Sequence, residues 1–430
     1  AMAESERKME VEQRVGKLQG LLLGLQHVFV SNVWLDPLFI AAMIGMTPLA
    51  TTSFINTVFV IAGMVTLMQA TRLARLPIVQ GPSASFDSLM ITTGKAQGLS
   101  AAYGGMLVSA AVVFVLSVTG IIGKLRSLFT PAVSGTVICI VGVVLSQFTM
   151  VEFLGGTPDT DGFLNISTLT LSVSTTVIVV VLSVFGRSWW RRYAFLIGLV
   201  VGDMIAAMTI GLDFSQVKEA AWFGLPKFMP HGAFVWDQGV ILTFVVAYMA
   251  AIMEAMGVYQ AAAELTDIRL DNKRIRRGFI GESTGSLLSS VLGGLPTTAY
   301  AQNVGLLRLT RTGSRYPVIW AGGLLLVLGF VPKAGALLGL TPGAVVGGLF
   351  LPAAAGLFMS GISLLMKMER TESHFTVVGL SLLLAIALPG NMASVPGFLG
   401  TLLSNAILVG ATSVIILQLL LVQLPKRLGK

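Results

Sequence analysis

A few ionisable side chains interrupt the long apolar stretches of this sequence, and they are the first candidates for chemistry. Six of them lie inside such stretches or at their edge: His27, Asp87, Asp203, Glu254, Glu264 and Glu282. An ionisable group in an apolar stretch is costly to bury with its charge, so it marks a functional position by default. Glu254, in the run Ala-Ile-Met-Glu-Ala-Met-Gly, is the first choice. A carboxyl group there can take a proton from one side and release it to the other.

Each of these residues also has a structural interpretation. Glu254 can pair with a neighbouring helix, and Glu282 can be a carboxylate near a helix start, where the helix dipole favours it. Glu282 and His27 are both candidates for a proton relay, although His27 can equally be a hydrogen-bonded core residue. Asp87 can supply the charge of a half-helix near a cavity, and Asp203 can serve packing or a subunit contact.

Two amides, Gln302 and Asn303, end a short polar segment of the chain. Amides offer hydrogen-bond donors and acceptors together, which suits the mixed edge of a purine or pyrimidine, as the carboxylate of Glu254 suits its N–H groups. Asn303 is also a typical helix-capping residue, so a structural role for it stays open.

The elements that must position these groups include two interrupted segments, 76–86 and 295–303. Each begins with a Leu-Pro break, continues with polar and small residues, and opens a short apolar stretch. A Thr-Pro motif also recurs about half the chain length apart, at Thr130 and Thr341. Non-helical backbone at membrane depth is tolerated where it lines a cavity, so paired breaks in two inverted halves indicate a substrate site. Two unrelated helices kinked by proline are the alternative.

The composition is that of a membrane protein, since 54% of the residues are hydrophobic and 11% are charged. Apolar runs of roughly 20 residues fit the thickness of a bilayer. The predicted spans are 18–40, 47–70, 77–93, 99–122, 129–149, 167–186, 193–212, 238–260, 279–294, 300–310, 316–332, 341–364, 375–390 and 398–424. Fourteen spans make two halves of seven, and an odd number per half puts the halves in opposite orientations.

The net charge of +8 follows from topology rather than from a nucleic-acid partner. With a cytoplasmic N-terminus, all but four of the 28 lysines and arginines fall in cytoplasmic loops or termini. The exceptions are Lys95, Lys218, Lys227 and Lys333. This distribution follows the positive-inside rule and predicts that both termini are cytoplasmic.

Other classes of function find little support in the sequence. The single cysteine, Cys139, lies in an apolar run, and the three histidines lack metal-ligand spacing, so we expect neither a metal nor another cofactor. The sequence contains no nucleophile–base pair and no phosphate-binding loop, so an enzyme is not expected. A channel is disfavoured because inverted repeats around a midplane site suit alternating access.

Three motifs carry a resemblance to a known family. They are Leu25-Gln26-His27, Glu254-Ala255-Met256-Gly257, and Gln302-Asn303-Val304-Gly305 followed by Leu309-Thr310. With them the chain resembles the nucleobase–ascorbate transporter (nucleobase:cation symporter-2) family over essentially its full length.

The resemblance implies an all-α, multi-pass protein of the inner (plasma) membrane with fourteen spans as a seven-plus-seven inverted repeat. Spans three and ten would each carry a short β-strand. A core domain would comprise 18–122 and 238–332, and a gate domain 129–212 and 341–424. The family also implies a homodimer in which the core moves against the gate like an elevator.

The resemblance further implies a small-molecule nucleobase as substrate and a proton as the coupling ion, although sodium is used by some relatives. The substrate would lie between the two strands, held by Glu254 and Gln302. The other expected substrate-site residues are Asn303, Ala84, Ser85, Phe86, Tyr300 and Ala301, and the expected proton-coupling residues are Glu254, Glu282 and His27. Ala84 stands where the family has an aromatic residue, so stacking would fall to Phe86 or Tyr300.

The Gln302-Asn303 pair resembles the xanthine and uric-acid branch, whereas the uracil branch has a glutamate in place of the glutamine. A purine of the xanthine, urate, guanine or hypoxanthine class is therefore expected, with an oxidised purine such as xanthine or urate favoured. Two departures are Val258, where relatives often carry an acidic residue or histidine, and Arg311 after Thr310. The alternatives are a uracil or other pyrimidine symporter of the same family, and a sulfate or bicarbonate transporter of the same fold.

Overall fold

The computed structural model describes residues 10–187, 190, 191, 193–300, 303, 304, 306, 307 and 312–429, without the side chains of Phe398 and Thr401. This part of the chain is mostly helical and contains one two-stranded sheet. Its first half contains α1 (Lys17–Ser31), α2 (Leu35–Ile44), α3 (Pro48–Thr71), β1 (Gln80–Pro82), η1 (Ala84–Phe86), α4 (Asp87–Ala96), α5 (Leu99–Val118), α6 (Ile121–Leu125), η2 (Arg126–Leu128), α7 (Pro131–Leu154), α8 (Ile166–Phe185), α10 (Ala194–Thr209) and α11 (Ser215–Glu219). Its second half contains α12 (Gln238–Thr266), α13 (Asn272–Leu292), β2 (Thr297–Ala299), α15 (Tyr316–Gly329), α16 (Pro332–Gly339), α17 (Gly343–Leu365), α18 (Glu372–Ala387), η3 (Pro389–Asn391), α19 (Gly397–Leu403), α20 (Ala406–Gln418), η4 (Leu419–Gln423) and α21 (Leu424–Arg427).

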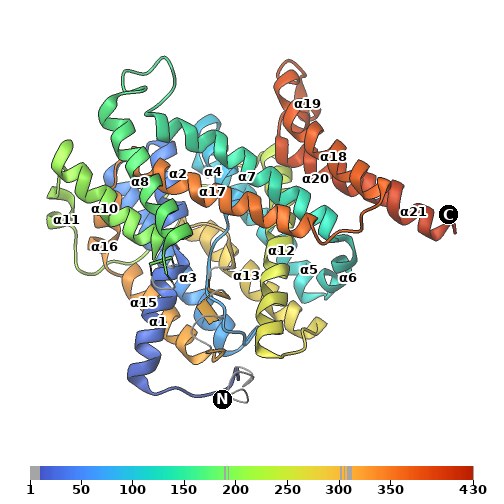
Figure 1. Cartoon of the computed structure of the whole chain (residues 1–430), viewed down its shortest axis with the longest axis horizontal. Coiled ribbons are helices and arrows are strands. Elements are labelled where there is room, and N and C mark those ends of the chain that lie inside the picture. The colour runs from blue at the N-terminus through green and yellow to red at the C-terminus, as the bar shows by residue number, and fades with distance from the viewer. Residues whose placement is uncertain are drawn as a thin grey trace.

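The helices pack in two groups. In the first, α3 packs against α15, α1 against α15, and α5 against α12 and α13. In the second, α7 packs against α17, α8 against α10 and α17, and α18 against α20. Figure 1 shows α7 and α17 crossing the molecule, with α8 and α10 toward one end and α18 and α20 toward the other.

The two interrupted segments form the sheet, and the family resemblance implied a short strand in each. Strands β1 and β2 pair antiparallel, with Gly81 opposite Thr298. The pairing extends beyond the strands, because the Tyr300 N–H donates to the Val79 carbonyl at 3.0 Å and the Ser83 N–H to the Pro296 carbonyl at 2.8 Å. An antiparallel pair is the arrangement expected of corresponding segments from two inverted halves.

The recurring Thr-Pro motif begins two helices that pack against each other, α7 and α17. A Cβ atom on Gly135 would lie 2.8 Å from the Gly361 carbonyl oxygen, so the two backbones approach closely. Pro352 inside α17 leaves the Gly348 carbonyl without its helical N–H partner, and the Thr176 hydroxyl of α8 donates to that carbonyl at 2.7 Å. The Gly348 carbonyl therefore receives its hydrogen bond from a neighbouring helix.

Most of the predicted spans overlap observed helices, although span 18–40 covers two helices and span 77–93 begins with strand β1. Nine helices of the described chain are long and apolar enough to cross a membrane, or ten if the bent pair α15 and α16 forms one span. The helix α10 is apolar but shorter, α4 follows a strand as a half-helix, and α13 carries a basic first half. Span 300–310 lies largely outside the described residues. A multi-pass membrane architecture is confirmed, whereas the count of fourteen stays a prediction.

Candidate functional site

A cavity of about 510 Å³ lies between the two groups of helices, beside the strand pair. Its polar wall comes from the first group and includes Asn32, Asp36, Glu254, Thr298 and Tyr300. Its opposite wall comes from α7, α8, α10 and α17 and is largely apolar, with Leu145, Val180, Phe195, Phe350 and Leu357. An apolar pocket with a few convergent polar groups is the usual form of a small-molecule site.

Glu254 lies at the middle of α12 and lines this cavity, as the sequence led us to expect for a substrate contact. Its Oε2 atom is buried and accepts no hydrogen bond from the described residues. A buried acceptor without a donor is costly, and an N–H group on a ligand would satisfy it. Glu254 is therefore available to a ligand and is not paired with a neighbouring helix in the described chain.

Tyr300 and Ala84 also line the cavity, one after each strand. The Tyr300 hydroxyl donates to the Pro82 carbonyl at 2.9 Å and so ties the two interrupted segments together. Its ring lies against Gly81, where a Cβ atom would approach the ring carbon Cζ to 2.7 Å. The position of the Tyr300 ring thus depends on the absence of a side chain at Gly81.

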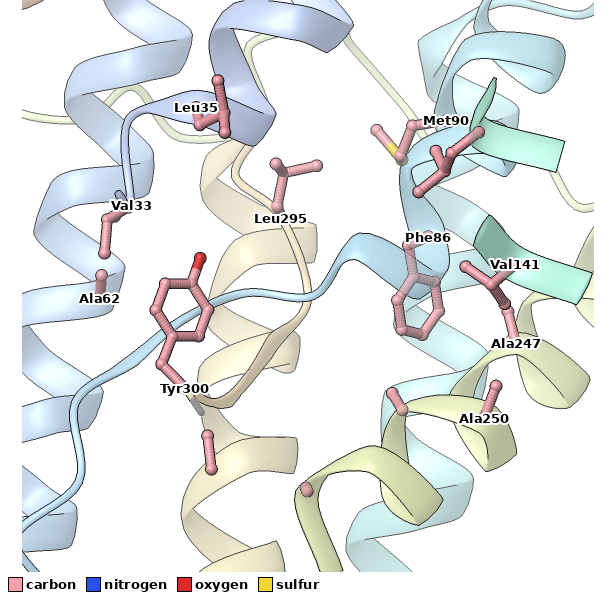
Figure 2. Packing of buried hydrophobic residues seen from close by; sticks show 14 of the residues in the cluster. Val33, Leu35, Ala62, Phe86, Met90, Val141, Ala247, Ala250, Leu295 and Tyr300 are labelled. Atoms are coloured by element: carbon pink, nitrogen blue, oxygen red, sulfur yellow. The ribbon is translucent and has the colours of Figure 1, made fainter. Parts of the chain in front are cut away.

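Ser85 and Phe86 are buried, but neither lines the cavity. The Phe86 ring contacts Phe244 at 5.8 Å and Tyr248 at 5.3 Å between centroids. Figure 2 shows it among the apolar residues near Val141 and Ala247. Of the two rings considered for stacking, Tyr300 is the one that borders the cavity.

Glu282 is placed differently from the sequence interpretation, which put it near the start of its span. The helix α13 already begins at Asn272, because Asp271 caps it by accepting the Arg274 N–H at 2.8 Å. Glu282 is consequently well inside the helix and only 2% exposed. Its Oε1 atom accepts the Ala299 N–H at 2.8 Å, and its carbonyl accepts the Thr297 hydroxyl at 2.8 Å. Glu282 thus holds strand β2 on α13.

His27 and Asn303 form a pair behind the strands. Asn303 Nδ2 donates to His27 Nδ1 and to the His27 carbonyl, at 3.1 Å each. Both side chains are buried, and neither lines the cavity. Because Nδ1 accepts this bond, a neutral His27 ring carries its proton on Nε2. The geometry gives Asn303 the task of orienting His27.

The structure brings a residue to the site that the sequence reasoning missed. Asp36 lines the cavity from the first turn of α2, and its carboxyl group lies within hydrogen-bonding reach of that of Asp87, in the first turn of α4. Asp36 falls inside the predicted first span, 18–40, so an inventory of charges in that span was enough to find it. Asp87 is fully buried beside the cavity wall, as its half-helix interpretation expected.

The four remaining candidates are Gln302, Ala301, Glu264 and Asp203. Gln302 and Ala301 lie outside the described residues, so their expected substrate contacts stay predictions. Glu264 is exposed near the end of α12, where Gln260 donates to it, and it is not an embedded charge. Asp203 accepts a hydrogen bond from the Thr341 hydroxyl at 2.8 Å, which agrees with its packing interpretation.

Comparison with known sequences decides the family. The sequence model described as "Permease family" matches residues 18–393. The chain belongs to this family, the nucleobase–ascorbate transporters. It is therefore a multi-pass membrane transporter.

Individual relatives cover almost the whole chain. The uric acid permease PucJ of Bacillus subtilis is 31% identical over 92% of this chain and 91% of its own length. The xanthine permease of Bacillus subtilis is 29% identical over 93% of each chain. A uracil permease of Paenibacillus larvae is 28% identical over 86% of each.

Solved structures agree on the fold. The transmembrane domain of the cyanobacterial bicarbonate transporter BicA has a TM-score of 0.61 at 15% identity, covering 95% of this chain and 100% of that chain. The murine anion transporter Slc26a9 has a TM-score of 0.67 at 12% identity, covering 96% and 69%. At this identity the likeness concerns the fold alone.

Proposed function

We propose that the protein imports a purine nucleobase by proton symport, with the base bound in the cavity beside strands β1 and β2. The observation that carries the proposal is the buried Oε2 atom of Glu254 on the cavity wall, which has no hydrogen-bond partner among the described residues. A purine offers ring N–H groups to this acceptor and a flat face to the Tyr300 ring. The relatives that are purine, xanthine and uric acid permeases support the substrate class.

Glu254 is also the proposed site of proton coupling. Its proton would be taken up with the base from one side of the membrane and released with it on the other. Reciprocal linkage then requires the bound base to change the proton affinity of Glu254. In this scheme Asn303, which bonds His27, and Glu282, which bonds strand β2, support the site, and any relay through His27 would use Nε2.

For the transport step we propose an elevator-type movement of a core domain, 18–122 and 238–332, against a gate domain, 129–212 and 341–424. The cavity wall supports this division, because its polar side comes from helices and strands of the first set and its apolar side from the second. An apolar wall lets one set slide past the other without breaking hydrogen bonds at the substrate. The proposal includes fourteen spans, a homodimer, and both termini on the cytoplasmic side of the inner membrane.

The proposal is tested by uptake of radiolabelled guanine, hypoxanthine and xanthine into proteoliposomes with an imposed pH gradient. We expect accumulation that collapses when a protonophore removes the gradient. Glu254→Gln is expected to abolish pH-driven accumulation, whereas Glu264→Gln, an exposed carboxyl group on the same helix, is expected to leave it intact. Accumulation by Glu254→Gln equal to that of the wild type would remove Glu254 from the coupling step.

The same vesicles separate the alternatives. Uptake of uracil without any purine would keep the family and change the substrate to a pyrimidine. Uptake of bicarbonate or sulfate alone would make the protein an anion transporter. The described cavity lining contains two carboxyl groups, Asp36 and Glu254, and no lysine, arginine or histidine, which does not favour an inorganic anion.

A further inference from the structure

The carboxyl pair of Asp36 and Asp87 gives the cavity a feature that the proposed coupling scheme does not use. Asp36 borders the cavity, and Asp87 lies directly behind it, fully buried. Glu254 lines the same cavity as Asp36, and Asp87 begins α4, which packs against the helix α2 that carries Asp36. Two acidic side chains therefore line the polar wall, and a third lies buried on a neighbouring helix.

Helix capping does not account for Asp87. An acidic residue in a first helical turn often serves the helix N-terminus by accepting backbone N–H bonds. Neither carboxylate oxygen of Asp87 accepts such a bond or any other from the described residues. Its neighbour is the Asp36 carboxyl group, with which it can share one proton, because two carboxylates in contact repel when both are charged.

A bound metal ion does not account for the three acidic groups either. The described residues contain no cluster of three or more histidine, cysteine or acidic side chains arranged to hold a metal. The described lining of the cavity also lacks a cationic side chain. Acceptor groups that are buried without donors in the protein are satisfied most directly by donors on the cargo.

We propose that the Asp36–Asp87 pair is a selectivity element that favours a neutral or cationic purine bearing an amino group and rejects an oxidised, anionic purine. The inference rests on the proposed function and narrows its substrate class. An amino group donates to the Asp36 carboxylate, which Asp87 holds in place through the shared proton. An anion such as urate places its charge against the Asp36 carboxylate in a cavity of low polarity, where like-charge repulsion is weakly screened.

The test is equilibrium binding of guanine, hypoxanthine and urate to the purified full-length chain at pH 7. Guanine and hypoxanthine differ by one amino group, so their ratio of dissociation constants isolates the predicted contact. A hydrogen bond to a charged group corresponds to about tenfold to hundredfold in affinity. We therefore expect guanine to bind at least about tenfold more tightly than hypoxanthine, and urate to bind most weakly.

Asp36→Asn and Asp87→Asn are each expected to bring the guanine-to-hypoxanthine ratio to within about threefold of unity and to improve urate binding. Asp203→Asn, which changes a half-buried acidic residue bonded to Thr341 away from the cavity, is the matched control and should keep the wild-type ratio.

The outcomes separate this inference from the proposed function. Wild-type protein that binds urate as tightly as guanine overturns the inference, even if both acidic variants fail to fold. An unchanged ratio in a folded Asp36→Asn variant overturns it as well. In both cases purine transport stands, whereas the absence of binding by every purine would overturn the proposed function together with the inference.

Discussion

Glu282 Oε1 accepts the backbone N–H of Ala299 at 2.8 Å, across 17 residues of sequence. Ala299 lines the cavity, and Glu282 does not. A carboxyl group on α13 thereby holds strand β2 in its position in the cavity wall. Ser286 on the same helix adds a second contact, because its hydroxyl accepts the Thr297 N–H at 3.1 Å. On the other strand, Thr66 of α3 accepts the Gln80 N–H at 3.0 Å. Each strand is thus anchored to a helix behind it.

The first prediction concerns this anchor. Glu282→Ala leaves the Ala299 N–H buried without an acceptor, and we expect a loss of about 1–3 kcal/mol in unfolding free energy and weaker purine binding. Glu282→Gln keeps an acceptor oxygen and should restore binding. Thermal unfolding in detergent and equilibrium binding check both, with Glu264→Ala as the exposed control. Full binding by Glu282→Ala would contradict the anchoring role.

The second prediction concerns the contact between Gly81 and Tyr300. Gly81→Ala places a methyl group 2.7 Å from the Tyr300 ring carbon, so the ring must move out of its position on the cavity wall. We expect purine affinity to fall about tenfold, with about 1–3 kcal/mol of strain. Gly323→Ala on α15, where nothing lies within 4 Å, is the matched control and should be neutral or slightly stabilising. Equal affinities of the two variants would show that the Tyr300 ring does not shape the site.

The third prediction concerns the pair formed by His27 and Asn303. A double-mutant cycle with His27→Ala and Asn303→Ala should give a coupling free energy of about 1 kcal/mol in thermal or chemical unfolding, because Asn303 Nδ2 donates to the His27 ring. The second bond, to the His27 carbonyl, survives His27→Ala and does not enter the cycle. The same cycle between Asn303 and Glu264 should give a coupling free energy near zero. If the His27 cycle also gives zero, Asn303 does not orient the histidine.

The fourth prediction is a pH dependence outside the membrane-spanning segments. Hydrogen bonds and charge from Arg315, with Arg75 adding to them, lower the pKa of the Glu12 carboxyl group below its usual value. A lowered folded-state pKa means that the stabilisation is present above the unfolded pKa of about 4.3 and is lost as pH falls through the folded value. Since Glu12 is largely exposed, the contribution is under about 1 kcal/mol.

Wild-type protein and Glu12→Gln should therefore differ in melting temperature at pH 7 and converge as the pH falls below about 4. Glu10→Gln serves as the neighbouring control. A difference that grows on acidification would contradict the sign of this linkage.

The strands and the principal carboxyl group were predictable from the sequence. A Leu-Pro break followed by small and polar residues favours an interruption of the membrane helix over a proline kink, so segments 76–86 and 295–303 were expected to line a cavity. Strands β1 and β2 lie inside these segments, and Glu254 lies on the cavity they border. Hydrophobicity and proline placement depend only on neighbouring residues in the sequence. The interrupted segments and the embedded carboxyl group could therefore be found without knowing the fold.

The long-range pairings were not predictable in the same way. The first predicted span reads as one apolar stretch, yet α1 ends at Ser31 and Asn32 adopts a left-handed φ of 56°, after which α2 carries Asp36 toward Asp87. The depth of Glu282 depended on a cap at Asp271, which brings a basic run into α13. In both cases the position of a charge follows from where a helix begins or ends, and single residues decide that.

The most direct test of the central claim is ligand-induced stabilisation of the purified protein by guanine, hypoxanthine, xanthine, uracil and bicarbonate, in wild type and Glu254→Gln. A ligand that binds only the folded state raises stability by about 2.7 kcal/mol at 100 times its dissociation constant. We expect a higher melting temperature with at least one purine, no shift with bicarbonate, and loss of the purine shift in Glu254→Gln. A shift with uracil or bicarbonate alone, or a purine shift unchanged in Glu254→Gln, would contradict the account.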